Sequence, residues 1–336
     1  IVKRICDPGS DDAIAMMLAM KSDAIDLIGV TTVNGNRIVP KTTENALRVV
    51  QFMKSSVPVY RGCEEPIICN EIPGRKPGLP RVTLNDCHGD FLPLPEAEIR
   101  TEKEHAVFYL VKTLMESEGD IYVAAVGPLT NLAMALRIEP KIAGKIKQLV
   151  IMGGGHCGAN ASPAAEFNFY ADPEAAKIVM DSAIPKVILP LDATWRACLS
   201  EEKCKELAQL GTPEAKVAAA LVQKRIDNLK VNDVSEHNYA LRHQAGTVAG
   251  AMLYRYDNHM APIHDALAIA YLINENVVTE LADANVDIDI AGGLCDGRMV
   301  ADFHNAKKSK APVTAKVALN SDAGLFTDML FAALGK

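Results

Sequence analysis

The sequence of 336 residues lacks the features that mark membrane, nucleic-acid-binding and disulfide-rich proteins. It contains no run of about 18 apolar residues, so we expect no transmembrane helix and no membrane partner. Lysine and arginine are scattered and the net charge is −7, which argues against a nucleic-acid partner. The eight cysteines are dispersed and form no C-x-x-C pair, so we expect reduced thiols in a cytoplasmic protein.

The chain also lacks internal repeats, low-complexity tracts and an obvious linker. Its hydrophobic share of 49% is ample for a core, and 23% charged residues with only 5% aromatics describe an ordinary globular protein. The length alone would allow one large domain or two ordinary ones. Because nothing divides the chain, we predict a single domain over residues 1–336.

Strand-like apolar runs alternate with helical patterns through the first half of the chain. We expect strands at residues 1–5, 26–33, 57–60, 121–125, 149–152 and 186–189, and helices at 10–20, about 40–54, 104–116 and 173–182. This alternation predicts an α/β fold with a mostly parallel central sheet flanked by helices on both faces. In such sheets ligands bind beyond the carboxyl ends of the strands.

The second half of the chain is expected to add helices and an edge to this sheet. Residues 200–257 look largely helical and predict a mainly helical insertion. Two or three strands between about Val286 and Val317 should lead into a closing helix from Asp322. Residues 61–101 are irregular and rich in Pro, Gly and polar groups, and so long a stretch is typical of a lid or binding loop.

Three acids lie within six residues in the turn Cys6-Asp7-Pro8-Gly9-Ser10-Asp11-Asp12. The turn joins an expected strand to an expected helix, where free backbone N–H groups favour anions. An acidic helix start explains Asp11 and Asp12, but Asp7 lies before the turn and adds no capping. Three crowded carboxylates repel one another unless a cation or a shared proton relieves them. A hard divalent metal with oxygen ligands is the natural relief.

Two polar segments downstream could bind a ligand. Asn34-Gly35-Asn36 follows a strand, where a tight turn explains Asn34 and Asn36 fits either a turn or a ligand. In the segment 160–168, an extended backbone would place Glu166 and Asn168 on one face and Phe167 on the other. Such amide and carboxylate groups suit a polyhydroxylated ligand, and a solvated loop is an equally good explanation.

His264-Asp265 opens an apolar helix and so repeats the pattern of the acidic turn. An aspartate there is usually a cap and a lone histidine is usually structural, but the repetition favours a shared site. His88, in the irregular stretch, is a weaker candidate. Gly153-Gly154-Gly155 marks a close backbone approach but lacks the G-x-G-x-x-G spacing of a dinucleotide site.

Together these segments resemble the inosine-uridine preferring nucleoside hydrolases. The resemblance rests, in the family's order, on residues 6–12, 31–36, 126–131, 151–155, 160–168 with Asp172-Pro173, and His264-Asp265. It implies an open, Rossmann-like nucleoside hydrolase fold and a ribohydrolase that uses tightly bound Ca²⁺. It also implies a role in nucleoside salvage and assembly as a homodimer or homotetramer.

The resemblance assigns roles to individual residues. Its metal ligands would be Asp7, Asp12, Asp265 and the backbone carbonyl of Thr130, and its ribose-binding residues Asp11, Asn36, Met152, Asn160, Glu166 and Asn168, with His88 as a further substrate contact. Breaking the N-glycosidic bond builds positive charge on the sugar, and water must reach C1′. We expect Asp7 to deprotonate a Ca²⁺-bound water and His264 to protonate a purine leaving group.

The sequence departs from the family at two positions. Ile5 stands where the family usually has an acid, and Asp90 follows His88-Gly89 in place of further glycines.

Two other functions compete with hydrolysis of ribonucleosides. An aspartyl-phosphate phosphohydrolase would need a second acid at Gly9, and a catalytically weak, calcium-dependent nucleoside or ribose binder would not need both Asp7 and His264.

Overall fold

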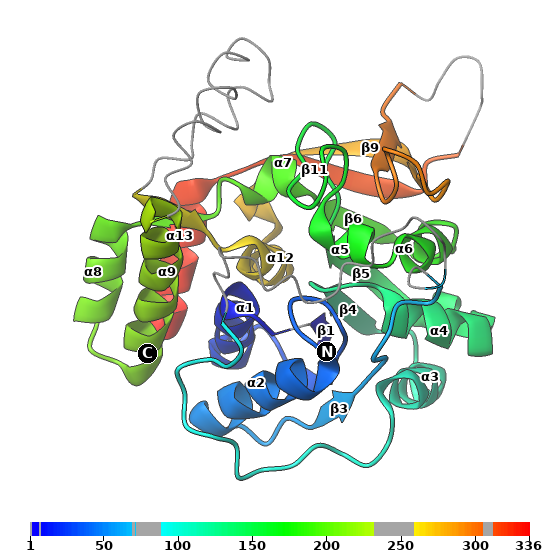
Figure 1. The fold of residues 1–336 in the computed structure, drawn as a ribbon. Helices are drawn as coiled ribbons and strands as arrows, with labels where there is room; N and C mark the ends of the chain where they lie inside the picture. Colours follow the sequence, from blue (N-terminus) through cyan, green and yellow to red (C-terminus); the bar gives the residue numbers. More distant parts are fainter. Residues whose placement is uncertain (1, 7, 69–70, 72–88, 232–258, 305–311) are drawn as a thin grey trace.

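The computed structural model describes residues 2–6, 8–68, 71, 89–231, 259–304 and 312–336 (Figure 1). Within these ranges nine strands form one sheet in the order β10-β9-β11-β6-β5-β4-β1-β2-β3. The strands are β1 (Val2–Cys6), β2 (Leu27–Thr32), β3 (Val59–Arg61), β4 (Ile121–Ala125), β5 (Ile146–Met152), β6 (Lys186–Leu189), β9 (Val278–Ile288), β10 (Met299–Asp302) and β11 (Ala315–Ser321).

The sheet is mostly parallel, as the alternating sequence pattern predicts. Every neighbouring pair from β11 to β3 is parallel, and β9 pairs antiparallel with both β11 and β10. The chain fills one side of β1 with β2 and β3 and then crosses to β4 on the other side. This reversal creates a switch point, so the loops that follow β1 and β4 meet where α/β sheets bind ligands.

Helices cover both faces of the sheet (Figure 1). One layer holds α1 (Ser10–Lys21), α2 (Val39–Phe52), α12 (His264–Ile273) and α13 (Ala323–Leu334), and the other holds α3 (Ala106–Glu116), α4 (Thr130–Ile138) and α6 (Pro173–Met180). Strand β4 shows why both are needed, because Ala124 packs in the first core and Val123 and Ala125 in the second.

The helical insertion is confirmed over the part that the structure describes. Helices α8 (Glu201–Gln209) and α9 (Pro213–Val231) follow the short α7 (Leu191–Thr194). Residues 232–258 of the predicted insertion lie outside the described ranges. Two strands that the sequence did not predict, β7 (Cys198–Ser200) and β8 (Met260–Pro262), pair antiparallel beside the insertion. Three residues are too few for a periodic signal.

Some element boundaries differ from the sequence prediction. Strand β5 begins at Ile146 and β9 at Val278, both earlier than expected. Along β9, buried and exposed residues alternate only from Ala284 onward, so its first residues carry no strand-like pattern. Short 3-10 helices, η2 (Pro140–Lys145) and η3 (Glu275–Val277), complete the layers.

The described helices and cysteines bear on two of the predictions made from composition. A search of the described helices finds none that is both long and apolar enough to cross a membrane. The cysteines that the structure describes as free thiols are Cys63, Cys157, Cys198, Cys204 and Cys295.

Candidate active site

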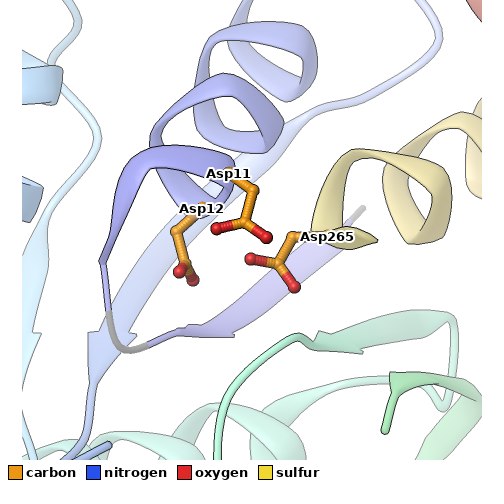
Figure 2. Close-up of side chains that lie close together, drawn as sticks. All are labelled: Asp11, Asp12 and Asp265. Atoms are coloured by element: carbon orange, nitrogen blue, oxygen red, sulfur yellow. The ribbon is translucent and has the colours of Figure 1, made fainter. Parts of the chain in front are cut away.

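Three aspartates meet where helices α1 and α12 begin. Carboxylate oxygens of Asp11, Asp12 and Asp265 all lie within 4.8 Å of one another. In Figure 2 the side chains from α1 and α12 point into the same space. Their exposed fractions are 6%, 0% and 4%, so water screens their mutual repulsion poorly. An all-oxygen donor set of this kind could hold a hard divalent cation.

Helix capping does not account for these acids. The N-cap of α12 is Ile263, which has no capping side chain, and Asp265 lies one residue inside the helix. The N-cap of α1 is Gly9, whose backbone N–H donates to Oδ2 of Asp12 at 3.1 Å. Asp12 therefore takes part in a capping interaction, whereas neither helix needs Asp11 or Asp265 as its cap.

Small buried residues allow the two helices to bring their first turns together. On α1, Ala13, Ala15 and Ala19 are completely buried, and α12 contributes Ala266 and its alanine neighbours at the same degree of burial. Helices α1 and α12 pack directly against each other, and short side chains permit a close approach. The alanine-rich sequences that follow both acidic starts thus bring the carboxylates close together.

Asn36 joins the acidic cluster, while Asn34 belongs to a turn. Nδ2 of Asn36 lies 3.4 Å from Oδ2 of Asp12. The backbone N–H of Asn34 donates to the carbonyl of Cys63, and that of Gly35 to the carbonyl of Arg37. The structure thus places Asn36 beside the candidate site.

His264 is buried, and residues at and just after the end of α7 contact its ring. Its Nδ1 lies 2.8 Å from the hydroxyl oxygen of Thr194 at the end of α7, and the two groups share a hydrogen bond. The indole ring of Trp195 meets the imidazole edge-on, with ring centroids 6.2 Å apart. This hydrogen bond engages Nδ1 and helps to fix the orientation of the imidazole ring.

Glu166 and Asn168 are buried, but the expected extended backbone is wrong. Residues Phe167–Ala171 form helix α5, and Glu166 is its N-cap. Its carboxylate accepts the backbone N–H groups of Asn168 at 3.0 Å and Gly154 at 2.8 Å, and this local capping favours a helix over a strand. Burial nevertheless raises the pKa of Glu166 to about 7.

The other ribose-binding candidates on this side of the sheet are fixed by backbone contacts. The amide of Asn168 donates to the carbonyls of Val126 at 3.1 Å and Met152 at 3.0 Å, so it joins the ends of β4 and β5. Asn160 is exposed, and its side-chain oxygen accepts the backbone N–H of Phe167 at 2.8 Å. Asn160 therefore closes its own loop.

The triple glycine at the end of β5 marks the close approach that the sequence predicted. A Cβ atom added to Gly153 would meet the ring of Phe169 at 2.6 Å, and one on Gly155 would overlap the carbonyl of Gly158. Gly154 has a φ of +74° that favours glycine. The loop after β5 is therefore pressed against α5.

Thr130 opens α4 directly after β4. Its hydroxyl donates to Oδ2 of Asp172 at 2.6 Å, and Asp172 also accepts the backbone N–H groups of Ala175 and Ile67. Burial raises the pKa of Asp172. This network holds the first turn of α4 at the switch point of the sheet.

Two of the predicted site residues lie outside the described ranges. Asp7 is the proposed base and metal ligand, and His88 is a proposed substrate contact. The neighbours of both are described. The carbonyl of Pro8 accepts from Nδ2 of Asn45 at 3.0 Å, and Oδ1 of Asn45 accepts the backbone N–H of Leu92 at 2.9 Å. Asn45, on α2, thus connects the acidic turn to the loop that follows His88.

Two further residues near the cluster were not predicted from the sequence. Nη1 of Arg225, on α9, lies 2.8 Å from Oδ1 of Asp11. Asn45 is the second, since it is 2% exposed and bridges two loops from the middle of α2. Both lie among other polar residues of their helices, and such residues usually mark a solvated face.

The family model for the inosine-uridine preferring nucleoside hydrolases matches residues 5–328. The chain belongs to this family. The pyrimidine-specific ribonucleoside hydrolase RihB of Escherichia coli O157:H7 is 35% identical over 324 residues, which cover 94% of this chain and 92% of the relative. RihB of E. coli O9:H4 (strain HS) is 35% identical over 328 residues, covering 96% and 92%. The prediction of a nucleoside hydrolase is confirmed.

Solved structures agree with this family assignment at the level of the fold. A plant nucleoside hydrolase superimposes with a TM-score of 0.83 at 24% identity, over 99% of this chain and 98% of that one. A purine-preferring ribonucleoside hydrolase from Gardnerella vaginalis gives a TM-score of 0.81 at 24% identity, with the same coverage. The predicted nucleoside hydrolase fold is therefore confirmed.

Proposed function

We propose that this nucleoside hydrolase cleaves the N-glycosidic bond of ribonucleosides with a divalent cation, Ca²⁺, at the start of helices α1 and α12. The observation that carries the proposal is the trio of buried carboxylates Asp11, Asp12 and Asp265 within 4.8 Å of one another. Arg225 offsets one of these buried like charges, the other two need a further cation, and oxygen donors of this type match calcium. Membership of the nucleoside hydrolase family supports the reaction class.

The ligands in this proposal are Asp7, Asp12, Asp265 and the backbone carbonyl of Thr130. All of their donor atoms are oxygens, and Asp12 and Asp265 are already gathered at one place. When bound, the cation would orient a water molecule and lower its pKa, by less than zinc does. A carboxylate must therefore take the proton, and Asp7 is the proposed base because it is both a ligand and a neighbour of that water.

The remaining polar residues bind the sugar and the leaving base. Asp11, Asn36, Met152, Asn160, Glu166 and Asn168 are the proposed ribose contacts, with His88 as a further substrate contact. Carboxylate and amide groups can accept and donate to the sugar hydroxyls and so hold C1′ in reach of the water. His264 is the proposed acid, and it gives a proton from Nε2 to the departing purine nitrogen as the C1′–N bond breaks.

The substrate is a ribonucleoside whose base is not fixed by these contacts. The E. coli relatives are named as pyrimidine-specific, which favours uridine as the first substrate to test. A salvage role in the cytoplasm and assembly as a homodimer or homotetramer belong to the same proposal. A single domain over residues 1–336 is the simplest organisation for it.

A panel of nucleosides tests this function. Metal-replete protein is incubated with uridine, inosine and guanosine. Release of free base is followed by absorbance, and release of ribose is followed by a reducing-sugar assay. We expect equimolar base and ribose from at least one nucleoside. Release from none of them contradicts the proposal. Binding of ribose without turnover supports instead the alternative of a catalytically weak, calcium-dependent nucleoside-binding protein.

A further inference from the structure

Arg225 forms a nearly buried ion pair with one member of the acidic cluster. Its Nη1 atom lies 2.8 Å from Oδ1 of Asp11, and the two side chains are 12% and 9% exposed. The same nitrogen lies 3.5 Å from the hydroxyl oxygen of Ser10. A guanidinium stays protonated at any pH that the protein tolerates. A permanent positive charge from α9 is therefore held against the first turn of α1.

The packing of α9 on α1 fixes this contact. At the opposite end of the helix pair, Nζ of Lys21 lies 2.7 Å from Oε1 of Glu214. The two ion pairs join the end of α1 to the start of α9 and the start of α1 to the far part of α9, so the helices run antiparallel. Val222 and Ile226, which flank Arg225, are completely buried. The buried neighbours of Arg225 thus hold its side chain toward Asp11 and away from solvent.

The hydrogen-bond and ion-pair partners of Asp11 differ from those of Asp12. Asp11 has an arginine nitrogen on Oδ1, whereas Asp12 accepts from the backbone N–H of Gly9 and lies close to the amide of Asn36. A guanidinium bonded to a carboxylate oxygen competes with a metal ion for that oxygen and offsets part of the negative charge that would attract the ion. An ion-paired carboxylate can still accept hydrogen bonds from sugar hydroxyls, because its two oxygens offer about four acceptor sites. The chemistry of the pair thus separates Asp11 from its neighbours.

We propose that Arg225 is a positioning residue that reserves Asp11 for the ribose and keeps it out of the metal's ligand shell. The proposal rests on the proposed function, in which Asp12 and Asp265 are ligands. It implies two opposite effects of the guanidinium. The positive charge weakens cation binding a few ångströms away, and the fixed orientation of Asp11 strengthens ribose binding.

The neutral variant Arg225→Gln separates these effects. Calcium is titrated into metal-stripped protein by calorimetry, and kcat and KM are measured with calcium restored. We expect calcium to bind about tenfold more tightly, because a like charge near the site is gone. We expect KM for the nucleoside to rise about tenfold with a smaller change in kcat, because Asp11 loses its orientation. A merely structural role would weaken both kinds of binding.

Two further variants make the test specific. Lys216→Met removes an exposed positive charge from the same helix and should change neither affinity. Arg225→Lys keeps the charge but loses the planar fork, so calcium affinity should match that of the parent while KM rises. This variant also serves if Arg225→Gln does not fold.

Unchanged or weaker calcium binding by Arg225→Gln overturns the proposal, as does an unchanged KM. The calorimetric arm needs no turnover, so it still tests Arg225 if the parent protein hydrolyses no nucleoside. Failure of the proposed function appears as inactivity of the metal-replete parent. Failure of this inference appears as the wrong sign of the affinity change in the variant. The two failures are therefore distinguishable.

Discussion

The hydroxyl oxygen of Thr194 lies 2.8 Å from Nδ1 of His264, and both side chains are buried. The contact joins α7, which follows β6, to the first residue of α12. Helix α7 is itself fixed, because the hydroxyl of Ser321 on β11 donates to the carbonyl of Ala193 at 2.8 Å. The central sheet thereby sets the orientation of the imidazole next to Asp265.

Thr194→Val should impair departure of the base more than binding. Valine has the shape of threonine without the hydroxyl, so the imidazole loses its partner at Nδ1. We expect kcat for inosine to fall about tenfold with KM nearly unchanged, because a misplaced acid transfers its proton poorly. A nitrophenyl riboside, whose leaving group needs no proton, should be hydrolysed almost as fast as by the parent.

Thr194→Ser restores the hydroxyl and should recover most of the lost kcat. His264→Ala should reduce hydrolysis of purine nucleosides more than that of uridine. If Thr194→Val or His264→Ala loses equal activity on purine, pyrimidine and nitrophenyl substrates, His264 does not protonate the leaving base.

Asp7→Asn should leave the fold intact and abolish most of the turnover. Asparagine keeps the size of the side chain and one oxygen ligand but cannot accept a proton from water. We expect a fall in kcat on the order of 10³-fold. Steady-state kinetics measure it, with circular dichroism to verify folding. Turnover within a few-fold of the parent would mean that another group is the base.

Glu166 should make the protein less stable as the pH rises toward neutrality. Burial raises its pKa to about 7 from an ordinary value of 4.5. Between these values the unfolded chain is ionised while the folded chain still holds the proton, so folding loses stability with rising pH and the loss levels off above about 7. Below 4.5 the group is neutral in both states and contributes no pH dependence.

Glu166→Gln removes this titration. The unfolding free energy of the parent minus that of the variant should decrease by about 2 kcal/mol between pH 5 and pH 8. Urea denaturation at several pH values measures the difference. Glu98→Gln makes the same change at an exposed glutamate and serves as the matched control. A difference for Glu166→Gln that stays constant from pH 5 to pH 8 would show that burial does not raise the pKa of its carboxyl.

Asn45→Leu should destabilise the protein and reduce turnover together. The substitution leaves the carbonyl of Pro8 and the backbone N–H of Leu92 without this partner in a buried position, which costs about 2–3 kcal/mol. Asn285→Leu is the matched control, because Nδ2 of Asn285 also donates to a proline carbonyl, that of Pro312, at the surface. We expect the control to change stability by less than about 0.5 kcal/mol.

If Asn45→Leu is destabilised no more than Asn285→Leu, the bridge from the acidic turn to the loop at Leu92 contributes nothing to the fold. Urea denaturation decides this. Loss of stability with full turnover would show that the bridge does not position Asp7.

The sequence alone predicted a mostly parallel sheet and a shared site at the starts of α1 and α12. Polar pairs at two helix starts, each followed by alanine-rich apolar residues, predicted that Asp265 would join Asp11 and Asp12 despite their distance in the chain. The parallel sheet makes this possible, because the loops at its carboxyl edge converge whatever their separation in sequence.

Arg225, Thr194 and Asn45 could not be predicted in the same way. Each is one of several polar residues in its helix, and its role depends on the element packed against it. The interpretation of residues 166–168 failed for a local reason. The carboxylate of Glu166 caps α5, a role in which glutamate is uncommon, and so the helix start carries none of the usual signals.

The calcium dependence of turnover tests the central claim most directly. The protein is stripped of metal, its residual metal content is verified by elemental analysis, and nucleoside hydrolysis is followed as CaCl₂ is added. We predict no turnover by the stripped protein and full recovery once about one calcium ion per chain is bound. Full turnover by protein that carries almost no metal would contradict the assignment of the carboxylates on α1 and α12 to a catalytic cation.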